Sequence, residues 1–201
     1  MKFVLASHNR KKLAEMQEIL RELGVEVVLQ SDVGLDLEPE ENGTTFAENA
    51  AIKAMAVMQA SGLPAIADDS GLCVDALNGA PGVYSARYGG PELDDTGRYR
   101  LLLQMMHGQA DRRAHFHTTI TCAFPNGDIL QDDVLTAEGD CHGAIAFAPM
   151  GEGGFGYDPV FFLPEKKKTF AQLTAEEKNA ISHRGRALET FRARLEEYFK
   201  K

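Results

Sequence analysis

Short apolar runs alternate with a helical pattern in the first thirty residues. Phe3 to Ala6 is an apolar run that predicts a buried strand. From about Lys11 to Leu23 the apolar residues recur at spacings of three and four, which is typical of one face of a helix. Gly24 is expected to end that helix, and Val25 to Leu29 predicts a second strand. The order strand, helix, strand indicates an α/β protein.

Two more helices are predicted in the middle of the chain. Thr45 and Glu48 are spaced as a capping box, which marks the start of a helix that continues to about Ser61. Leu93 to His107 predicts a third helix. A strand at Leu63 to Ala67 lies between them.

The later part of the chain is richer in strand patterns. Ala114 to Phe124 alternates apolar and polar residues, which predicts a strand with two different faces. Asn126-Gly127 predicts a hairpin turn, from which Ile129 to Ala137 returns as the next strand. A final helix is predicted from apolar residues in helical register, namely Leu188, Phe191, Leu195 and Tyr198.

Composition narrows the class of protein. The 201 residues are 44% hydrophobic and 25% charged, which suits one large domain or one domain in two lobes. No stretch approaches the roughly 20 apolar residues that span a bilayer. The apolar run near the N-terminus is too short for a secretion signal, so a cytoplasmic location is expected. The three cysteines form no paired motif, which argues against a zinc site.

The charge balance favours a small anionic ligand over a polynucleotide. A net charge of −9 is unlike the basic face of proteins that coat DNA or RNA. A local basic cluster nevertheless follows the first strand, where Arg10, Lys11 and Lys12 crowd the start of a helix. Cations are unfavourable at that end of the helix dipole, whereas a phosphate is favourable. The cluster therefore predicts a phosphate site, with a solvated charge run as the alternative.

Carboxylates gather at two places that suggest a metal. Asp68 and Asp69 directly follow the apolar strand that ends at Ala67, and adjacent like charges repel unless a cation lies beside them. Glu40 and Glu41 belong to an acidic loop further upstream. Mg²⁺ typically binds one or two carboxylates together with phosphates and water. We therefore expect Mg²⁺ to supply the missing positive charge.

Two motifs in the last third suggest contacts with a ligand. The stretch GEGGFGYDP, residues 151–159, precedes a strand, so it does not fit a dinucleotide loop, which must open a helix. Its aromatic residues between glycines can lie against a base, although a plain tight connection is the alternative. Ser182 is expected to cap the last helix, which places His183 and Arg184 in its first turn. Cations at that end of the helix dipole indicate an anionic or carbonyl partner, with an exposed surface face as the alternative for each residue.

Five long motifs follow one another along the chain, namely SHNRKK, EENGTTFAENAAIKA, ADDSGLCVDALNGAPGVYSARY, GGFGYDPVFF and LTAEEKNAISHRGRAL. In this order they resemble the inosine triphosphate pyrophosphatase-like proteins, also called XTP/dITP diphosphatases. The first motif often reads Thr-Gly-Asn in that family, and here it is Ser7-His8-Asn9. The resemblance runs from about Lys2 to Leu195.

This resemblance implies a fold and an activity. The fold is an elongated mixed β-sheet flanked by helices, in a single domain of residues 1–201 with two lobes and the active-site cleft between them. The activity is Mg²⁺-dependent hydrolysis of XTP, ITP and dITP to the monophosphate and pyrophosphate. The family also implies a homodimer. A purine nucleoside triphosphate is thus the expected partner, with no polynucleotide and no membrane.

The resemblance also implies residue roles. Asp69 is the proton acceptor, and Glu41 and Asp69 are the residues associated with the metal. Whether Asp68 or Asp69 contacts the metal directly stays open. The substrate-binding residues are Ser7, His8, Asn9, Arg10, Lys11, Lys12, Ser70, Phe155, Gly156, Tyr157, Asp158, Lys178, His183 and Arg184.

Chemistry gives these residues a consistent mechanism. No activated side-chain nucleophile is visible, so water is expected to attack the α-phosphorus and expel pyrophosphate. Donors from His183 and Arg184 are expected to meet the oxygen at C6 of hypoxanthine or xanthine, which adenine lacks. No residue is assigned to the rejection of guanine. Two rival hypotheses are a pyrophosphatase for modified pyrimidine or standard nucleotides, and a nucleotide sensor without hydrolysis.

Overall fold

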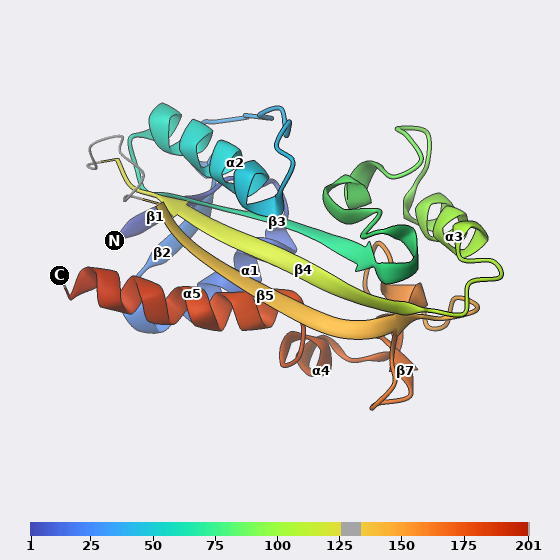
Figure 1. Ribbon diagram of the computed structural model, residues 1–201. Coiled ribbons are helices and arrows are strands. Elements are labelled where there is room, and N and C mark those ends of the chain that lie inside the picture. Colours follow the sequence, from blue (N-terminus) through green and yellow to red (C-terminus); the bar gives the residue numbers. More distant parts are fainter. Residues whose placement is uncertain (126–133, 201) are drawn as a thin grey trace. The chain divides into compact units, whose positions relative to one another are not determined.

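A seven-stranded mixed sheet runs through the computed structural model, which describes residues 1–125 and 134–200 (Figure 1). The strand order is β2-β1-β3-β4-β5-β6-β7. β1 is parallel to β2 and β3, whereas β6 is antiparallel to β5 and β7. The strands are β1 (Lys2–Leu5), β2 (Glu26–Leu29), β3 (Ala65–Val74), β4 (Arg113–Ala123), β5 (Val134–Ile145), β6 (Phe161–Leu163) and β7 (Lys168–Thr169).

Helices flank this sheet, which confirms the predicted α/β class. They are α1 (Arg10–Leu20), α2 (Phe46–Ser61), α3 (Asp95–Met105), α4 (Ala175–Asn179) and α5 (His183–Phe199). No helix in the described ranges is both long and apolar enough to cross a membrane.

The chain divides into two compact units. Unit 1 comprises the described residues of Met1–Asp69, Thr118–Gly139 and Arg186–Lys201, and unit 2 comprises Ser70–His117 and Asp140–Gly185. The single domain with a cleft between two lobes stays a prediction. The expected hairpin turn at Asn126-Gly127 and the first residues of the strand after it lie outside the described residues.

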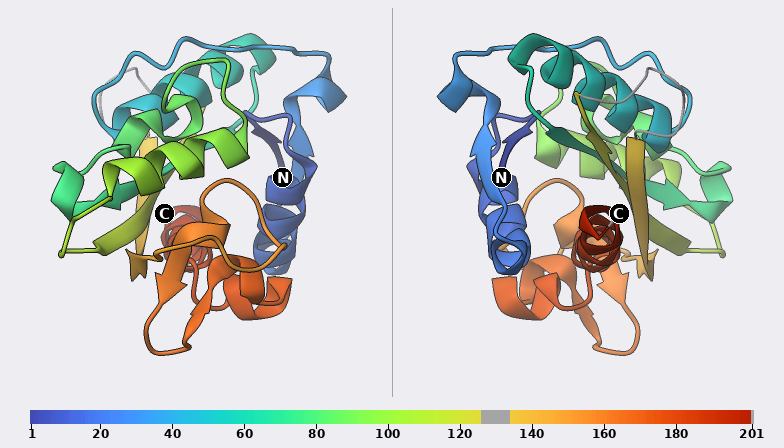
Figure 2. Two further views of the ribbon diagram at one scale, coloured as in Figure 1. Left: turned by 90° about the vertical axis from the view of Figure 1, so that its right-hand side faces the viewer. Right: turned by 90° about the vertical axis from the view of Figure 1, so that its left-hand side faces the viewer.

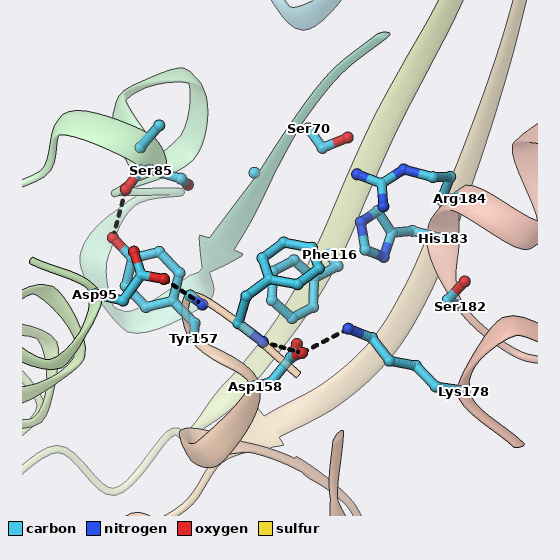
Figure 3. Close-up of a pocket in the computed structure, with 14 residues that line it drawn as sticks. Ser70, Ser85, Asp95, Phe116, Tyr157, Asp158, Lys178, Ser182, His183 and Arg184 are labelled. Carbon is cyan, nitrogen blue, oxygen red and sulfur yellow. Dashed lines mark hydrogen bonds and ion pairs between the residues drawn. The ribbon is translucent and has the colours of Figure 1, made fainter. Parts of the chain in front are cut away.

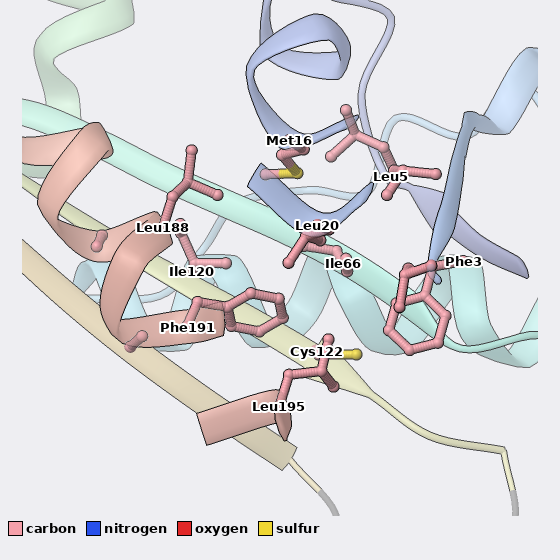
Figure 4. Packing of buried hydrophobic residues seen from close by; sticks show 14 of the residues in the cluster. Phe3, Leu5, Met16, Leu20, Ile66, Ile120, Cys122, Leu188, Phe191 and Leu195 are labelled. Carbon is pink, nitrogen blue, oxygen red and sulfur yellow. The ribbon is translucent and has the colours of Figure 1, made fainter. Parts of the chain in front are cut away.

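In unit 1 the strands are covered by helices on both faces. Figure 1 shows α2 over one face and α5 over the other, and Figure 2 shows α1 beside α5. Phe3, Leu5 and Ile66 belong to the cluster that α1 and α5 complete, part of which Figure 4 shows. Val4 and Ala65, next to them in sequence, pack with Val57 of α2 instead. This alternation follows from the strand geometry, in which successive side chains point to opposite faces.

Unit 2 has its own core. Leu102 of α3 belongs to the same buried cluster as Leu72 and Val74 of β3. Three phenylalanine rings pack at its centre: Phe116 lies 4.7 Å from Phe161 and 5.7 Å from Phe170, measured between ring centroids. Stacked and edge-on rings at such separations add to the free energy gained by burial.

The predicted elements agree with the observed ones near the N-terminus and differ at β3. Helix α2 has the expected capping box of Thr45 and Glu48, and it ends before Gly62, whose φ is +66°. The strand predicted to end at Ala67 continues to Val74. Asp68 and Asp69 therefore lie within β3 and not beyond its end.

Candidate active site

Asp68 and Asp69 contact helices on opposite faces of β3. Asp68 Oδ1 accepts a hydrogen bond from Lys12 Nζ of α1 at 2.9 Å, and its side chain is buried. Asp69 faces α2, where Lys53 Nζ lies 3.6 Å from Asp69 Oδ1. Each of the two carboxylates thus has a lysine beside it, which supplies positive charge from within the fold. The expected Mg²⁺ stays a prediction. Neighbouring Asp68 is the smallest of the influences that raise or lower the pKa of Asp69.

Burial sets the acidity of Asp69. Removal from water raises the pKa of this carboxyl above its ordinary value, and the charge of Glu41 raises it further. The ammonium of Lys53 and a hydrogen bond from Asn49 act in the opposite direction. A carboxylate with a raised pKa is a stronger base, so Asp69 is suited to accept a proton from water.

Glu41 and Asp69 offer the ligands that a hard divalent cation takes. Lys53 Nζ lies 3.2 Å from Glu41 Oε2 and 3.6 Å from Asp69 Oδ1, so one cation already lies close to both carboxylates. Among the described residues, no three His, Cys, Asp or Glu side chains gather as a metal cluster. The pair therefore fits a metal that takes its other ligands from phosphate and water, as Mg²⁺ commonly does.

The loop after β1 carries the predicted phosphate-binding residues of unit 1. Asn9 Oδ1 caps α1 by accepting hydrogen bonds from the backbone N–H groups of Lys11 and Lys12, at 2.9 and 3.3 Å. Ser7 Oγ in turn accepts a hydrogen bond from the Asn9 N–H at 3.1 Å. Arg10 and Lys11 are exposed, whereas Lys12 is held by Asp68. The charges available to an external anion are thus chiefly Arg10 and Lys11.

His8 in this loop contacts a neighbouring turn. Its Nε2 atom lies 3.0 Å from the side-chain nitrogen of Gln30 and 3.4 Å from Asp36 Oδ1. Gln30 is itself buried and bonds to the backbone of Leu37 in both directions. His8 therefore joins the phosphate loop to residues 30–37 of the same unit.

A pocket in unit 2 gathers every substrate-binding residue predicted from Ser70 onward (Figure 3). Its cavity volume is about 170 Å³. The predicted residues that line it are Ser70, Phe155, Gly156, Tyr157, Asp158, Lys178, His183 and Arg184. The sequence analysis did not single out Ser85, Asp95 and Phe116, which also line it.

Carboxylates hold the glycine-rich side of this pocket. Asp158 is buried, and its Oδ2 atom accepts hydrogen bonds from the Phe155 N–H at 3.0 Å and from Lys178 Nζ at 2.5 Å. Asp95 Oδ2 accepts one from the Gly156 N–H at 2.9 Å. Gly154 has a φ of +76°, and a Cβ there would overlap Asp158 Oδ2, so this position requires glycine. Hydrogen bonds from the N–H groups of Phe155 and Gly156 therefore fix the loop on either side of the exposed Phe155 side chain.

Aromatic and cationic side chains form the other surfaces of the pocket. The imidazole of His183 stacks on Phe116 with centroids 4.8 Å apart and planes 13° apart. Lys178 Nζ lies 4.6 Å from the centre of the Phe155 ring. Tyr157 donates a hydrogen bond to the backbone oxygen of Ser85 at 2.7 Å, and burial raises the pKa of its hydroxyl. The pocket thus combines flat apolar faces with polar groups.

The start of α5 has the predicted cap. Ser182 Oγ accepts a hydrogen bond from the Gly185 N–H at 3.0 Å, so His183 and Arg184 occupy the first turn of the helix. Both side chains are largely buried although both are polar. Figure 3 shows them next to Ser70 and Phe116 on one side of the pocket.

Lys53 and Asn49 are site residues that the sequence analysis missed. Both lie on α2, four residues apart, and thus on the same face of the helix. Lys53 is the only cation in that helix, which is a usable signal. Phe116 belongs to the strand predicted over Ala114 to Phe124, where nothing in the sequence distinguishes it from an ordinary core residue.

Fold and site together define a class of α/β proteins equipped to bind an anion and a flat ring. The chain belongs to the Ham1 family, whose sequence profile matches residues 3–194. A structure of a HAM1 protein from Coxiella burnetii has a TM-score of 0.91 and 45% sequence identity, covering 98% of this chain and 99% of that one. The Ham1 protein of Staphylococcus aureus gives 0.89 at 40% identity, covering 98% of this chain and 100% of that one.

Curated relatives carry a functional name. A dITP/XTP pyrophosphatase from Desulforamulus reducens is 51% identical over 190 residues, which cover 94% of this chain and 92% of that protein. A dITP/XTP pyrophosphatase from Haemophilus influenzae is 48% identical over 196 residues, covering 96% and 98%. The similarity extends over nearly the whole length of this chain and of each of these relatives.

Proposed function

We propose that this protein hydrolyses dITP, XTP and ITP to the nucleoside monophosphate and pyrophosphate, and so removes deaminated purines from the nucleotide pool. The observation that carries the proposal is the identity of about half, over nearly the full chain, to proteins named dITP/XTP pyrophosphatase. The pocket of unit 2 supports it, because flat apolar faces and polar groups suit a purine base.

Base selection is assigned to the first turn of α5. His183 and Arg184 offer N–H donors, which pair with the oxygen at C6 of hypoxanthine or xanthine. Adenine carries an amine at C6, so a buried donor facing it is left without an acceptor. Such mismatches reduce kcat/KM by factors of about 10⁴.

Hydrolysis is assigned to the carboxylates of Asp69 and Glu41 in unit 1. Asp69 accepts a proton from the attacking water, as its raised pKa favours. Arg10 and Lys11 attract the triphosphate through their exposed charges. Glu41 and Asp69 would hold Mg²⁺, which supplies charge neutralisation for the departing pyrophosphate. Lys53 stabilises the same two carboxylates before substrate arrives.

The proposal has two further parts. One is a homodimeric assembly, which the family resemblance implies, and the other is the cytoplasmic location expected from the sequence. Sedimentation of the purified chain tests the first, and a fluorescent fusion tests the second.

Purified protein incubated with Mg²⁺ and single nucleotides tests the proposed function. XTP, ITP and dITP should each give monophosphate and pyrophosphate, whereas GTP and ATP should be largely spared. Diphosphate with orthophosphate would contradict the proposed bond cleavage. Binding without turnover would favour the sensor hypothesis, and preferential hydrolysis of pyrimidine or standard nucleotides would favour the other rival.

A further inference from the structure

The side chain of Asn49 links the acidic loop to Asp69. It is completely buried on α2. Its Oδ1 atom accepts a hydrogen bond from the Gly43 N–H at 2.9 Å, and its Nδ2 atom donates one to Asp69 Oδ2 at 3.2 Å. Gly43 is two residues from Glu41, so one amide group contacts both the loop that carries Glu41 and the carboxylate of Asp69.

The orientation of this amide follows from its partners. A backbone N–H can only donate, so the group facing Gly43 must be the oxygen. The nitrogen then faces Asp69, whose carboxylate can only accept when ionised. Asn49 is therefore matched to the charged form of Asp69.

The hydrogen bond from Asn49 also distinguishes the two carboxylate oxygens of Asp69. Asp69 Oδ2 is bound to Asn49, whereas Oδ1 lies 3.6 Å from Lys53 Nζ, the same atom that lies 3.2 Å from Glu41 Oε2. The two oxygens of one carboxylate thus have different roles. One is fixed to the helix, and the other shares a cation with Glu41.

We propose that Asn49 is a positioning residue, which holds Asp69 and the Glu41 loop in register so that the carboxylates of Asp69 and Glu41 would hold one divalent cation together. The close approach of Gly43 agrees with this role. A Cβ on Gly43 would lie 2.7 Å from Asn49 Oδ1, so only glycine lets the loop come near enough to be tethered. The inference rests on the proposed function, because it concerns the same carboxylates.

The substitution Asn49→Asp tests the two hydrogen bonds of Asn49 separately, because it can keep one and must remove the other. The new side chain keeps an acceptor for Gly43 and loses the donor to Asp69. At mildly alkaline pH with Mg²⁺, kcat for dITP should fall by about 10- to 100-fold, as is typical when a partner behind a metal ligand is removed. KM should change by less than about two-fold, because Asn49 does not contact substrate. Asn42→Asp, in the same loop and exposed, adds the same charge and should leave both constants unchanged.

Asn49→Ala gives a readout without turnover and without an added charge. Binding of Mn²⁺ to the nucleotide-free protein, followed by electron paramagnetic resonance, should weaken about ten-fold. Melting curves test whether each variant is folded. If Asn49→Asp does not fold, the Mn²⁺ affinity of Asn49→Ala alone tests the positioning role of Asn49. Unchanged kcat in Asn49→Asp, or unchanged Mn²⁺ affinity in Asn49→Ala, would overturn the inference. Failure of the wild type to hydrolyse dITP would instead contradict the proposed function.

Discussion

Asp68 and Asp69 show how strand geometry separates residues that are adjacent in sequence. Ile66 and Asp68 point to the face of α1, whereas Ala65, Ala67 and Asp69 point to the face of α2. The side-chain period of two places them on opposite faces. Asp68 therefore forms a partly buried ion pair with Lys12 of α1, whereas Asp69 lies beside Lys53 and Asn49 of α2.

Replacing Asp69 with Asn should remove activity without unfolding the protein. The amide cannot accept the proton from water, so kcat for dITP should fall by about 10³-fold or more, since general-base catalysis contributes about 10²–10⁴-fold. Burial already disfavours the charged carboxylate, so the free energy of unfolding should stay within about 1 kcal/mol of wild type. Steady-state kinetics and urea unfolding measure the two quantities.

Asp68→Asn is the matched control, with the same chemical change one residue away. It breaks the ion pair with Lys12, and charged hydrogen bonds contribute about 1.5–3 kcal/mol. The free energy of unfolding should therefore decrease by about that amount. Equal loss of activity in both variants, with no difference in stability, would contradict the separation of roles.

Sequence alone could have assigned these partners in part. The alternation of side chains along β3 can be derived from the apolar residues Ala65 and Ile66, and Lys53 is conspicuous as the only cation of its helix. What sequence could not supply is the packing of α2 against Asp69, because that contact joins residues 16 and 20 positions apart through the tertiary fold. Without knowledge of that packing, nothing in the sequence indicates a role for Asn49.

At the scale of elements, helix α2 combines a strong start signal with the residues that hold Asp69. Thr45 Oγ1 accepts a hydrogen bond from the Glu48 N–H at 3.1 Å, and Glu48 Oε2 accepts one from the Thr45 N–H at 3.1 Å. The pKa of the Glu48 carboxyl is lowered by the hydrogen bonds that it accepts, first from the Thr44 N–H, then from the Thr44 hydroxyl and the Thr45 N–H. Asn49 follows directly after this first turn, so the cap fixes the helical end nearest to the site.

Thr45→Ala should therefore weaken the fold modestly. Loss of an N-terminal cap costs about 1 kcal/mol, and the midpoint of urea unfolding should move to lower concentration accordingly. Thr45→Ser keeps the hydroxyl and should behave like wild type. If the alanine variant were as stable as the serine variant, the cap would not contribute to the stability of α2.

At the scale of the whole molecule, local patterns predicted the elements better than their packing. The predicted β1, α1 and β2 were confirmed. Each has a pattern of apolar residues that reflects its burial against elements close in sequence. The core of unit 2 was not predicted, since it joins Leu72, Phe116 and Phe161 from three strands far apart in the chain. The pocket was anticipated in part, from the aromatic residues of the glycine-rich stretch and the polar start of the last helix. Phe116 was not, because nothing local distinguishes it from a core residue.

The account depends most on one claim, that water attacks the α-phosphorus of a deaminated purine nucleotide. Hydrolysis of dITP in water enriched with oxygen-18, with mass analysis of both products, tests it directly. The label should appear in the monophosphate, and pyrophosphate should contain none, because attack at the α-phosphorus expels unlabelled pyrophosphate. Label in pyrophosphate would mean attack at the β-phosphorus and would contradict the mechanism.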